Sequence, residues 1–273
     1  MLRFVFLIFT AISSFLPSSA YSLDEKRKLQ QVLIDVGEYN LSFNFIAGTK
    51  PAIVFESGSG VDSSHWNNIV ETLSNKIDNA IITYDRAGYG LSELPKSPYD
   101  IYGEVEGLKK GLEQLGYANS FVYVGHSYAY YLMEMYGAKY SNSLNSLVFI
   151  DPITVEFIDS MGGIEEELKN IDLSQLPNNN LGKALTRETE GLAETYASVK
   201  NLRDKYRKNC FIISAEKPEW SSLKEIYEWQ AAHKKLSEKC GSKLVVAKGS
   251  THDVPTHSPE VIVSKLVSIL SKL

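Results

Sequence analysis

The chain has 273 residues, of which 44% are hydrophobic and 22% charged, and its formal net charge is −5 at pH 7. This composition is ordinary for a globular protein, and the length allows one large α/β domain or two small ones. A mildly acidic chain without a block of basic residues is a poor candidate for binding nucleic acid. Two cysteines exclude a fold built on a disulfide framework and a four-cysteine zinc site.

The first twenty residues differ in composition from the rest. Arg3 gives them a positive start, residues 4–12 are almost wholly apolar, and residues 18–20 are the small residues that a signal peptidase requires. The apolar stretch is too short for a membrane span. We therefore expect a secretory signal cleaved after Ala20, with a retained anchor as the alternative. A secreted or periplasmic protein follows, with no stable membrane span after cleavage.

A predicted hairpin is followed by alternating strands and helices. Its two strands cover residues 32–36 and 41–47. Short, apolar runs rich in β-branched residues, typical of parallel strands buried on both faces, follow at 52–56, 80–84, 121–125, 146–150, 211–214 and 243–247. Amphipathic segments predict helices at 64–74, 102–115, 129–140, 221–236 and 259–273. This alternation indicates a doubly wound, mostly parallel sheet with the hairpin as antiparallel edge strands.

One interval interrupts this alternation. Residues 152–209 contain no strand-like run, and they are charged and helix-prone apart from the loop "LPNNN". An insertion between two parallel strands lies over the carboxyl ends of the sheet, where ligands bind in open α/β folds. We therefore expect a small helical cap.

Four segments, each after a predicted strand, carry a resemblance to a known family: "VFESGSG", "YDRAGYGLS", "VGHSYA" and "KGSTHDVPTHSPEVI". In this order they resemble the α/β-hydrolase superfamily. The resemblance implies an α/β-hydrolase fold, with a mostly parallel eight-stranded sheet flanked by helices and a helical cap after strand six. The core would comprise residues 21–151 and 210–273, and the cap residues 152–209.

The segment "VGHSYA" predicts a nucleophile. In a nucleophile elbow a serine lies on a tight strand-to-helix turn that exposes its hydroxyl group, and Ser127 has that position. Gly125 and Ala129 are small enough for the turn, although the common form of the motif has glycine in place of Ala129. The alternative interpretation is that Ser127 only caps the next helix.

His252 is the expected base, because it follows the last strand, where the family resemblance places it. Of the other histidines, His257 is interpreted as a surface or helix-entry residue, and His126 as a packing residue or a partner of the oxyanion loop. His65 is expected to start a helix and His233 to lie in the middle of one.

The acid of the predicted triad has more than one candidate. Its role is to orient the imidazole and to stabilise the imidazolium. Asp151 ends the sixth strand, an acid position that resembles that of pancreatic-type lipases and some haloalkane dehalogenases. The commoner position follows the seventh strand, where the alternatives are Glu216 and Glu219. Asp151 is favoured, because a short carboxylate at a strand tip is held more rigidly.

Two backbone N–H groups should form an oxyanion hole, those of Tyr128, directly after the nucleophile, and of Ser59 in the loop after the third strand. Many relatives have His-Gly in that loop, where this chain has Ser57-Gly58. Glu56 ends a buried strand and needs a partner, for which Arg86 is the expected residue.

Cys210 and Cys240 each precede a strand in the last part of the chain, and neighbouring parallel strands would bring them to the same, non-catalytic edge of the sheet. A structural disulfide between them is one expectation, since an exported protein meets an oxidising compartment. We expect no metal and no cofactor, because the histidine spacings and the glycine-rich loop fit neither a zinc site nor a P-loop.

These features predict an exported serine hydrolase that cleaves a small carboxylic ester through an acyl-enzyme, as a monomer or a dimer. Its partner would be a small-molecule acyl substrate. The alternatives are a prolyl-aminopeptidase-like peptidase or amidase, a thioesterase or acyltransferase and, from another class, a non-catalytic binding protein on a hydrolase fold.

Overall fold

The structure is a computed structural model that describes residues 27–202, 209–219 and 222–273. The predicted signal segment, residues 1–20, lies outside the described residues. The strands form one sheet in the order β1-β2-β4-β3-β5-β6-β7-β8. Their bounds are β1 (Gln30–Asp35), β2 (Asn40–Ile46), β3 (Thr49–Glu56), β4 (Asn79–Tyr84), β5 (Phe121–His126), β6 (Leu144–Ile150), β7 (Cys210–Ala215) and β8 (Val245–Ala247).

The sheet is mostly parallel. The first two strands pair antiparallel with each other, and β2 joins β4 in the same antiparallel sense. All the remaining pairs, from β4 to β8, are parallel. The predicted fold is therefore confirmed: an eight-stranded α/β-hydrolase sheet with an antiparallel hairpin at one edge.

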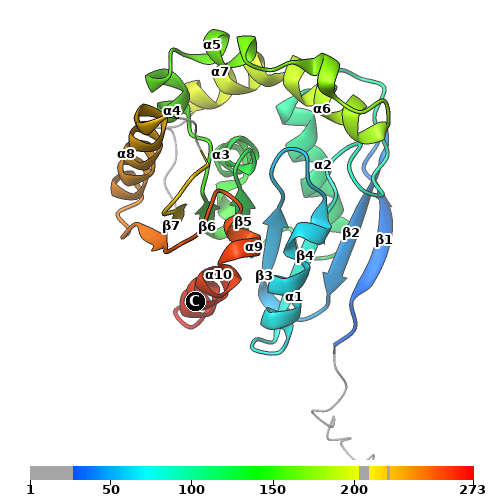
Figure 1. The fold of residues 1–273 in the computed structure, drawn as a ribbon. Helices are drawn as coiled ribbons and strands as arrows, with labels where there is room; N and C mark the ends of the chain where they lie inside the picture. Colours follow the sequence, from blue (N-terminus) through cyan, green and yellow to red (C-terminus); the bar gives the residue numbers. More distant parts are fainter. Residues whose placement is uncertain (1–26, 203–208, 220–221) are drawn as a thin grey trace, which may run out of the picture.

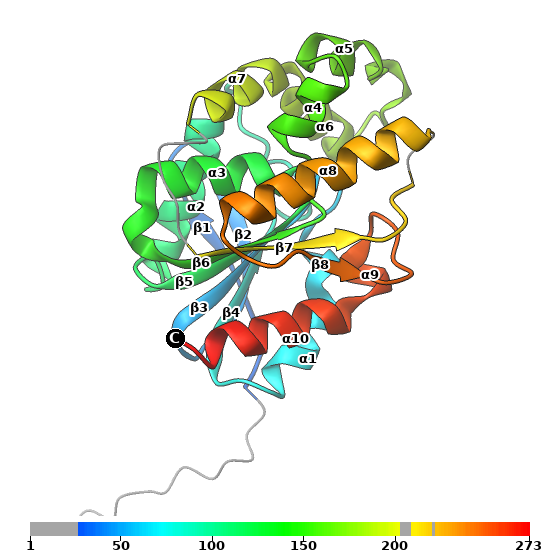
Figure 2. The same cartoon turned by 90° about the vertical axis from the view of Figure 1, so that its left-hand side faces the viewer.

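Helices cover both faces of the sheet, as Figure 2 shows. On one face lie α2 (Ile101–Gln114), α3 (Ala129–Tyr140) and α8 (Leu223–Lys239), and on the other lie α1 (Asn67–Ser74) and α10 (Pro259–Leu270). The side chains of β5 alternate between the two faces: Phe121 and Tyr123 join one hydrophobic cluster, and Val122 and Val124 join the other. Burial on both faces explains why the central strands are continuous apolar runs.

A further set of helices joins β6 to β7 and gathers at one end of the sheet, as Figure 1 shows. These are α4 (Val155–Ser160), α5 (Ile164–Lys169), α6 (Asn180–Glu190) and α7 (Leu192–Leu202). An ion pair of the partly buried Arg187 with the buried Glu104, 2.6 Å between Nη1 and Oε1, joins α6 to α2. We call α4 to α7 the cap helices.

Among the helices of the described residues, none is both long and apolar enough to cross a membrane. The predicted helix at 221–236 begins at Leu223 and continues to Lys239, and the last helix ends at Leu270, three residues before its predicted end. Helix ends are where sequence patterns are weakest, because the terminal turn contributes few buried side chains.

Candidate active site

The turn after β5 brings Ser127 to the edge of the sheet. Ser127 has a φ of 55°, in the left-handed region that a residue with a side chain rarely adopts. Gly125 permits the turn, since a Cβ there would lie 2.7 Å from the Cβ of Ala129 and 2.4 Å from the Sδ of Met133. Ser127 is partly exposed, whereas every other residue from 121 to 137 is buried. Its hydroxyl group therefore lies at the surface of the site rather than in the core.

A continuous chain of hydrogen bonds runs from Ser127 through His252 to Asp151. The Oγ atom of Ser127 lies 2.9 Å from Nε2 of His252, and Nδ1 of His252 lies 2.7 Å from Oδ2 of Asp151. In the matching tautomer, Nδ1–H donates to the carboxylate and Nε2 accepts from the serine hydroxyl. This is the arrangement that prepares a serine for nucleophilic attack.

The carboxylate of Asp151 binds His252 through Oδ2 and is held in place through its other oxygen, Oδ1. Asp151 is fully buried, with a φ of 42°, and its Oδ1 atom accepts from the amide of Ala215 at 2.8 Å and from Nε1 of Trp229 at 3.0 Å. Burial by itself raises the pKa of Asp151, but hydrogen bonds with His252 and with the amide of Ala215 bring the pKa below its ordinary value. The carboxylate is therefore ionised at neutral pH.

Trp229 and His233 lie one turn apart on α8, and neither the contact of Trp229 nor the role of His233 was predicted from the sequence. His233 is fully buried, with Nε2 2.8 Å from the carbonyl oxygen of Pro152 and Nδ1 2.8 Å from Oγ of Ser214. Burial lowers the pKa of His233 and keeps it neutral. The signal that was available is the i, i+4 spacing of these two residues in a predicted helix that packs on β7.

The alternative acids are positioned differently. Oε2 of Glu216 accepts from the amide of Gly249 at 2.8 Å, and the side chain of Glu219 is exposed. The structure thus places Asp151, and neither of these glutamates, on Nδ1 of His252.

Two further histidines surround the loop that carries His252. Nε2 of His126 lies 2.9 Å from the carbonyl oxygen of His252, and the two rings are 4.7 Å apart. Burial lowers the pKa of His126 to about 3, so this ring is neutral and donates to that carbonyl group. His65 lies in a short 3-10 helix and its Nε2 is 2.7 Å from Oδ1 of Asp253. His257 is exposed, with Nδ1 2.7 Å from the Thr251 hydroxyl.

The loop after β3 passes directly beside the nucleophile. A Cβ on Gly58 would lie 3.3 Å from the Cβ of Ser127 and 3.0 Å from Nδ1 of His126, so a larger residue there would crowd the nucleophile. Arg86 supports this loop by donating from Nη1 to the carbonyl oxygen of Ser57 at 2.5 Å and from Nη2 to that of Gly58 at 3.1 Å. Its guanidinium group also lies 5.2 Å from the ring centroid of Tyr128.

The predicted pairing of Glu56 with Arg86 is present only as a longer contact, 3.6 Å between Oε1 and Nη1. Glu56 instead accepts hydrogen bonds from the hydroxyl groups of Tyr84 and Tyr123. Burial raises the pKa of Glu56 to about 7, against the lowering effect of Arg86. The closer carboxylate to Arg86 is that of Glu188 in α6, at 2.8 Å from Nη2.

Cys210 and Cys240 form a disulfide with a Cα–Cα distance of 5.2 Å. Cys210 begins β7, whereas Ala215, which contacts the predicted acid, ends it, so the disulfide lies at the opposite end of that strand. Throughout the described residues there is no group of three or more histidine, cysteine or acidic side chains arranged to hold a metal ion.

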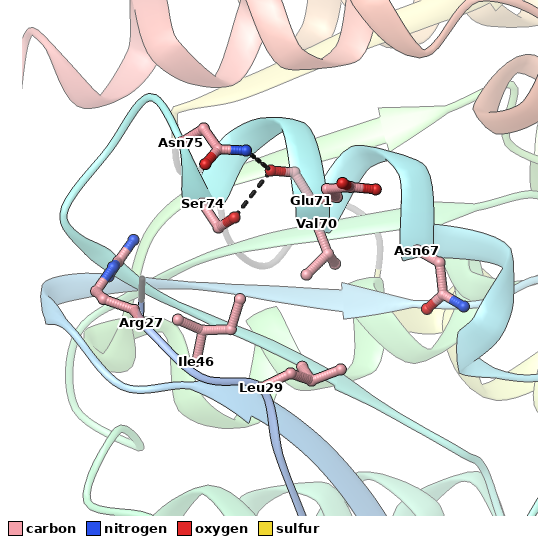
Figure 3. A pocket seen from close by; sticks show the side chains of 8 residues that line it. All are labelled: Arg27, Leu29, Ile46, Asn67, Val70, Glu71, Ser74 and Asn75. Atoms are coloured by element: carbon pink, nitrogen blue, oxygen red, sulfur yellow. Dashed lines mark hydrogen bonds between the residues drawn. The ribbon is translucent and has the colours of Figure 1, made fainter. Parts of the chain in front are cut away.

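A separate cavity of about 360 Å³ lies between β2 and α1, as Figure 3 shows. Ile46 and Val70 are among its apolar lining residues, and Arg27 and Glu71 are its charged ones. None of the residues that line it belongs to the hydrogen-bonded chain of Ser127, so we assign it no part in the chemistry of that site.

Residues 53–265 match the alpha/beta hydrolase family. The uncharacterized protein YqjL of Bacillus subtilis is 23% identical over 211 residues, which cover 77% of this chain and 79% of that protein. An uncharacterized protein of Mycobacterium tuberculosis is 25% identical over 143 residues, 52% of this chain and 38% of that protein. The chain therefore spans well under half the length of the mycobacterial relative.

Solved structures share the fold at low sequence identity. Mouse alpha/beta hydrolase domain-containing protein 10 superposes with a TM-score of 0.64 and 15% identity, covering 90% of this chain and 99% of that one. A predicted CIB-like hydrolase from Thermoplasma acidophilum gives a TM-score of 0.62 and 19% identity, with coverage of 90% and 99%. The enol-lactonase from Burkholderia xenovorans LB400 gives 0.60 and 17%, with coverage of 88% and 100%.

Proposed function

Because the chain belongs to the alpha/beta hydrolase family, we propose that it is a serine hydrolase that cleaves a small carboxylic ester through an acyl-enzyme. The observation that carries this proposal is the hydrogen-bonded chain from Ser127 through His252 to Asp151. Ser127 follows β5, Asp151 follows β6, and His252 lies in the loop after β8. His252 is 101 residues from Asp151 in sequence.

In the acylation step the Oγ atom of Ser127 attacks the ester carbonyl carbon, and its proton moves to Nε2 of His252. The imidazolium is stabilised by the ionised carboxylate of Asp151. The carbonyl oxygen becomes negative and accepts from the backbone N–H groups of Tyr128 and Ser59. Removing one such donor costs about 3 kcal/mol in the barrier. His252 then protonates the departing alkoxide, and an alcohol leaves.

In the second step water takes the place of the alcohol. His252 accepts a proton from the water as its oxygen attacks the acyl carbon, and the tetrahedral intermediate again uses the two backbone donors. Collapse returns the proton to Oγ of Ser127 and releases the carboxylic acid. No residue changes its net protonation over the cycle, so this chain can complete it with water as the second substrate.

We also propose that the protein works in the periplasm or outside the cell. The disulfide between Cys210 and Cys240 supports this location, since disulfides persist in oxidising compartments and are rare in the cytosol. The apolar segment at residues 4–12 supports it independently.

A panel of chromogenic substrates with one acyl group tests the reaction class. Purified protein is assayed with p-nitrophenyl butyrate, the matching p-nitroanilide and the matching thioester, beside Ser127→Ala. We expect turnover of the ester and loss of that turnover in the variant. Cleavage of the anilide at the rate of the ester would favour an amidase. No turnover of any of the three by the folded protein would overturn the proposal in favour of a binding protein.

A further inference from the structure

A buried carboxylate from the cap helices reaches the loop after β3. Glu188 lies on α6, and only 4% of its surface is exposed. Its Oε2 accepts from Nη2 of Arg86 at 2.8 Å and from the Tyr89 hydroxyl at 3.1 Å. Its Oε1 accepts from the hydroxyl group of Ser59, which is 129 residues away in sequence. The side chain of the predicted oxyanion donor is thus bound to the cap.

The loop has little rigidity of its own at this point. Ser59 is exposed and lies between two glycines, Gly58 and Gly60, the second with a φ of 80°. Glycine leaves the flanking peptide groups free to rotate. Arg86 holds the carbonyl oxygen atoms of Ser57 and Gly58. The Gly58 carbonyl belongs to the same planar peptide group as the Ser59 N–H, so Arg86 holds that group from its carbonyl side. The hydroxyl of Ser59 is the next point at which the loop is held.

We propose that Glu188 is a positioning residue that acts through Ser59: together with Arg86, it holds the Gly58–Ser59 peptide with its N–H toward the oxygen of the tetrahedral intermediate. This inference rests on the proposed function and adds that the oxyanion hole is assembled jointly by the core and the cap. Arg86 donates both to the carbonyl groups of the loop after β3, which belongs to the core, and to Glu188, which belongs to the cap. Its guanidinium group therefore connects the core to the cap.

The charge of Glu188 is compatible with this role because of Arg86. An unpaired carboxylate near a developing oxyanion would raise the barrier, since like charges repel in a site with low dielectric. The ion pair of Glu188 with Arg86 at 2.8 Å compensates that charge. The ring of Tyr128, the second donor, packs 5.2 Å from the same guanidinium group, so both segments of the oxyanion hole contact Arg86.

Ser59→Ala is the most direct test, because it removes the hydroxyl group and keeps the backbone N–H. We expect kcat to fall by about tenfold or more with KM unchanged, and by less than the 10²–10³ that follows from losing one donor outright, because the backbone N–H is still present. The inhibition constant of a trifluoromethyl ketone, whose adduct with the nucleophile carries an oxyanion, should rise by the same factor. If Ser59 had only a structural role, its substitution would change the stability of the protein and leave both kcat and the inhibition constant of the ketone unaltered.

Glu188→Ala and the double variant complete the cycle, with Glu190→Ala as the matched control, because Glu190 is exposed on the same helix. If Glu188 acts through Ser59, the double variant loses no more activity than the more affected single variant. Should Glu188→Ala fail to fold, Ser59→Ala beside Ser59→Thr, which restores a hydroxyl group, decides the question.

Three results would overturn the inference. These are a wild-type kcat and ketone affinity in Ser59→Ala, an additive double variant, and failure of Ser59→Thr to recover activity over Ser59→Ala. Wild-type protein that neither turns over the ester nor binds the ketone would overturn the proposed function and this inference together. Active wild-type protein with an unaffected Ser59→Ala would overturn the inference alone.

Discussion

Substituting Asp151 by asparagine changes one atom of the site and reverses its hydrogen bonding. In the native protein, Oδ1 accepts from the amide of Ala215 and from Nε1 of Trp229, and Oδ2 accepts from Nδ1 of His252. The side chain of asparagine has a single oxygen. The amide of Ala215 and Nε1 of Trp229 can only donate, so this oxygen must occupy the Oδ1 position. The NH₂ group must then face His252.

An NH₂ group facing Nδ1 demands the opposite tautomer of His252. Nδ1 must then accept, the proton moves to Nε2, and Nε2 can no longer take the proton of Ser127. The same reversal in a serine protease triad lowers kcat by about 10⁴, which corresponds to about 5 kcal/mol in the barrier. We expect a loss of that size for Asp151→Asn, with the fold intact because Ala215 and Trp229 keep their acceptor.

The assay is kcat/KM for p-nitrophenyl butyrate, with near-ultraviolet circular dichroism to check the fold. Glu216→Gln and Glu219→Gln are the matched controls, and each should retain activity within about threefold, because neither carboxylate contacts the reacting groups. A folded Asp151→Asn with more than about a tenth of wild-type activity would show that Asp151 does not set the tautomer of His252. A loss of about 10⁴ in either glutamine variant would contradict that role of Asp151 as well.

Two further predictions concern stability. Glu56 has a pKa of about 7 in the folded protein, whereas its ordinary value is 4.5. The contribution of protonated Glu56 to the free energy of unfolding is therefore fully present below pH 4.5 and is lost as the pH rises through 7. Between pH 5 and 8, urea unfolding should show that the wild type loses about 2.5 kcal/mol more than Glu56→Gln, and equal losses would contradict the burial argument. Cys210 and Cys240 are 30 residues apart, and replacing both by serine should lower the free energy of unfolding by about 3–4 kcal/mol through the entropy of the unfolded chain. An unchanged urea midpoint would show that the disulfide contributes nothing.

Much of the fold follows from local patterns in the sequence. The central strands are buried on both faces and therefore appear as apolar runs, and Gly125 marks the turn that exposes Ser127. Ser127 and His252 each follow a predicted strand, and the parallel register brings their segments to the same edge of the sheet.

The choice of acid needed the three-dimensional structure. Asp151 and Glu216 follow neighbouring parallel strands, so sequence order gives both a position near His252. The distance of 2.7 Å from Asp151 to His252 and the Gly249 amide on Glu216 distinguish them. The direction of a side chain at a strand tip depends on the backbone φ angle, which is 42° at Asp151. The residue pattern of the sequence does not specify this angle.

The residues that support the site were the least predictable. Trp229 is 78 residues from the carboxylate that it binds, and Glu188 is 129 residues from Ser59. Each lies on a helix whose orientation is set by packing against other elements. A sequence pattern indicates that such a helix has a buried face, and packing determines which polar group that face meets.

Activation of Ser127 as a nucleophile can be tested by the intact mass of the protein before and after reaction with a small fluorophosphonate, followed by peptide mapping. We predict one adduct on the wild-type protein, located on Ser127, and none on Ser127→Ala. Asp151→Asn should react far more slowly under the same conditions. No adduct on folded wild-type protein, or the same adduct on Ser127→Ala, would contradict the account.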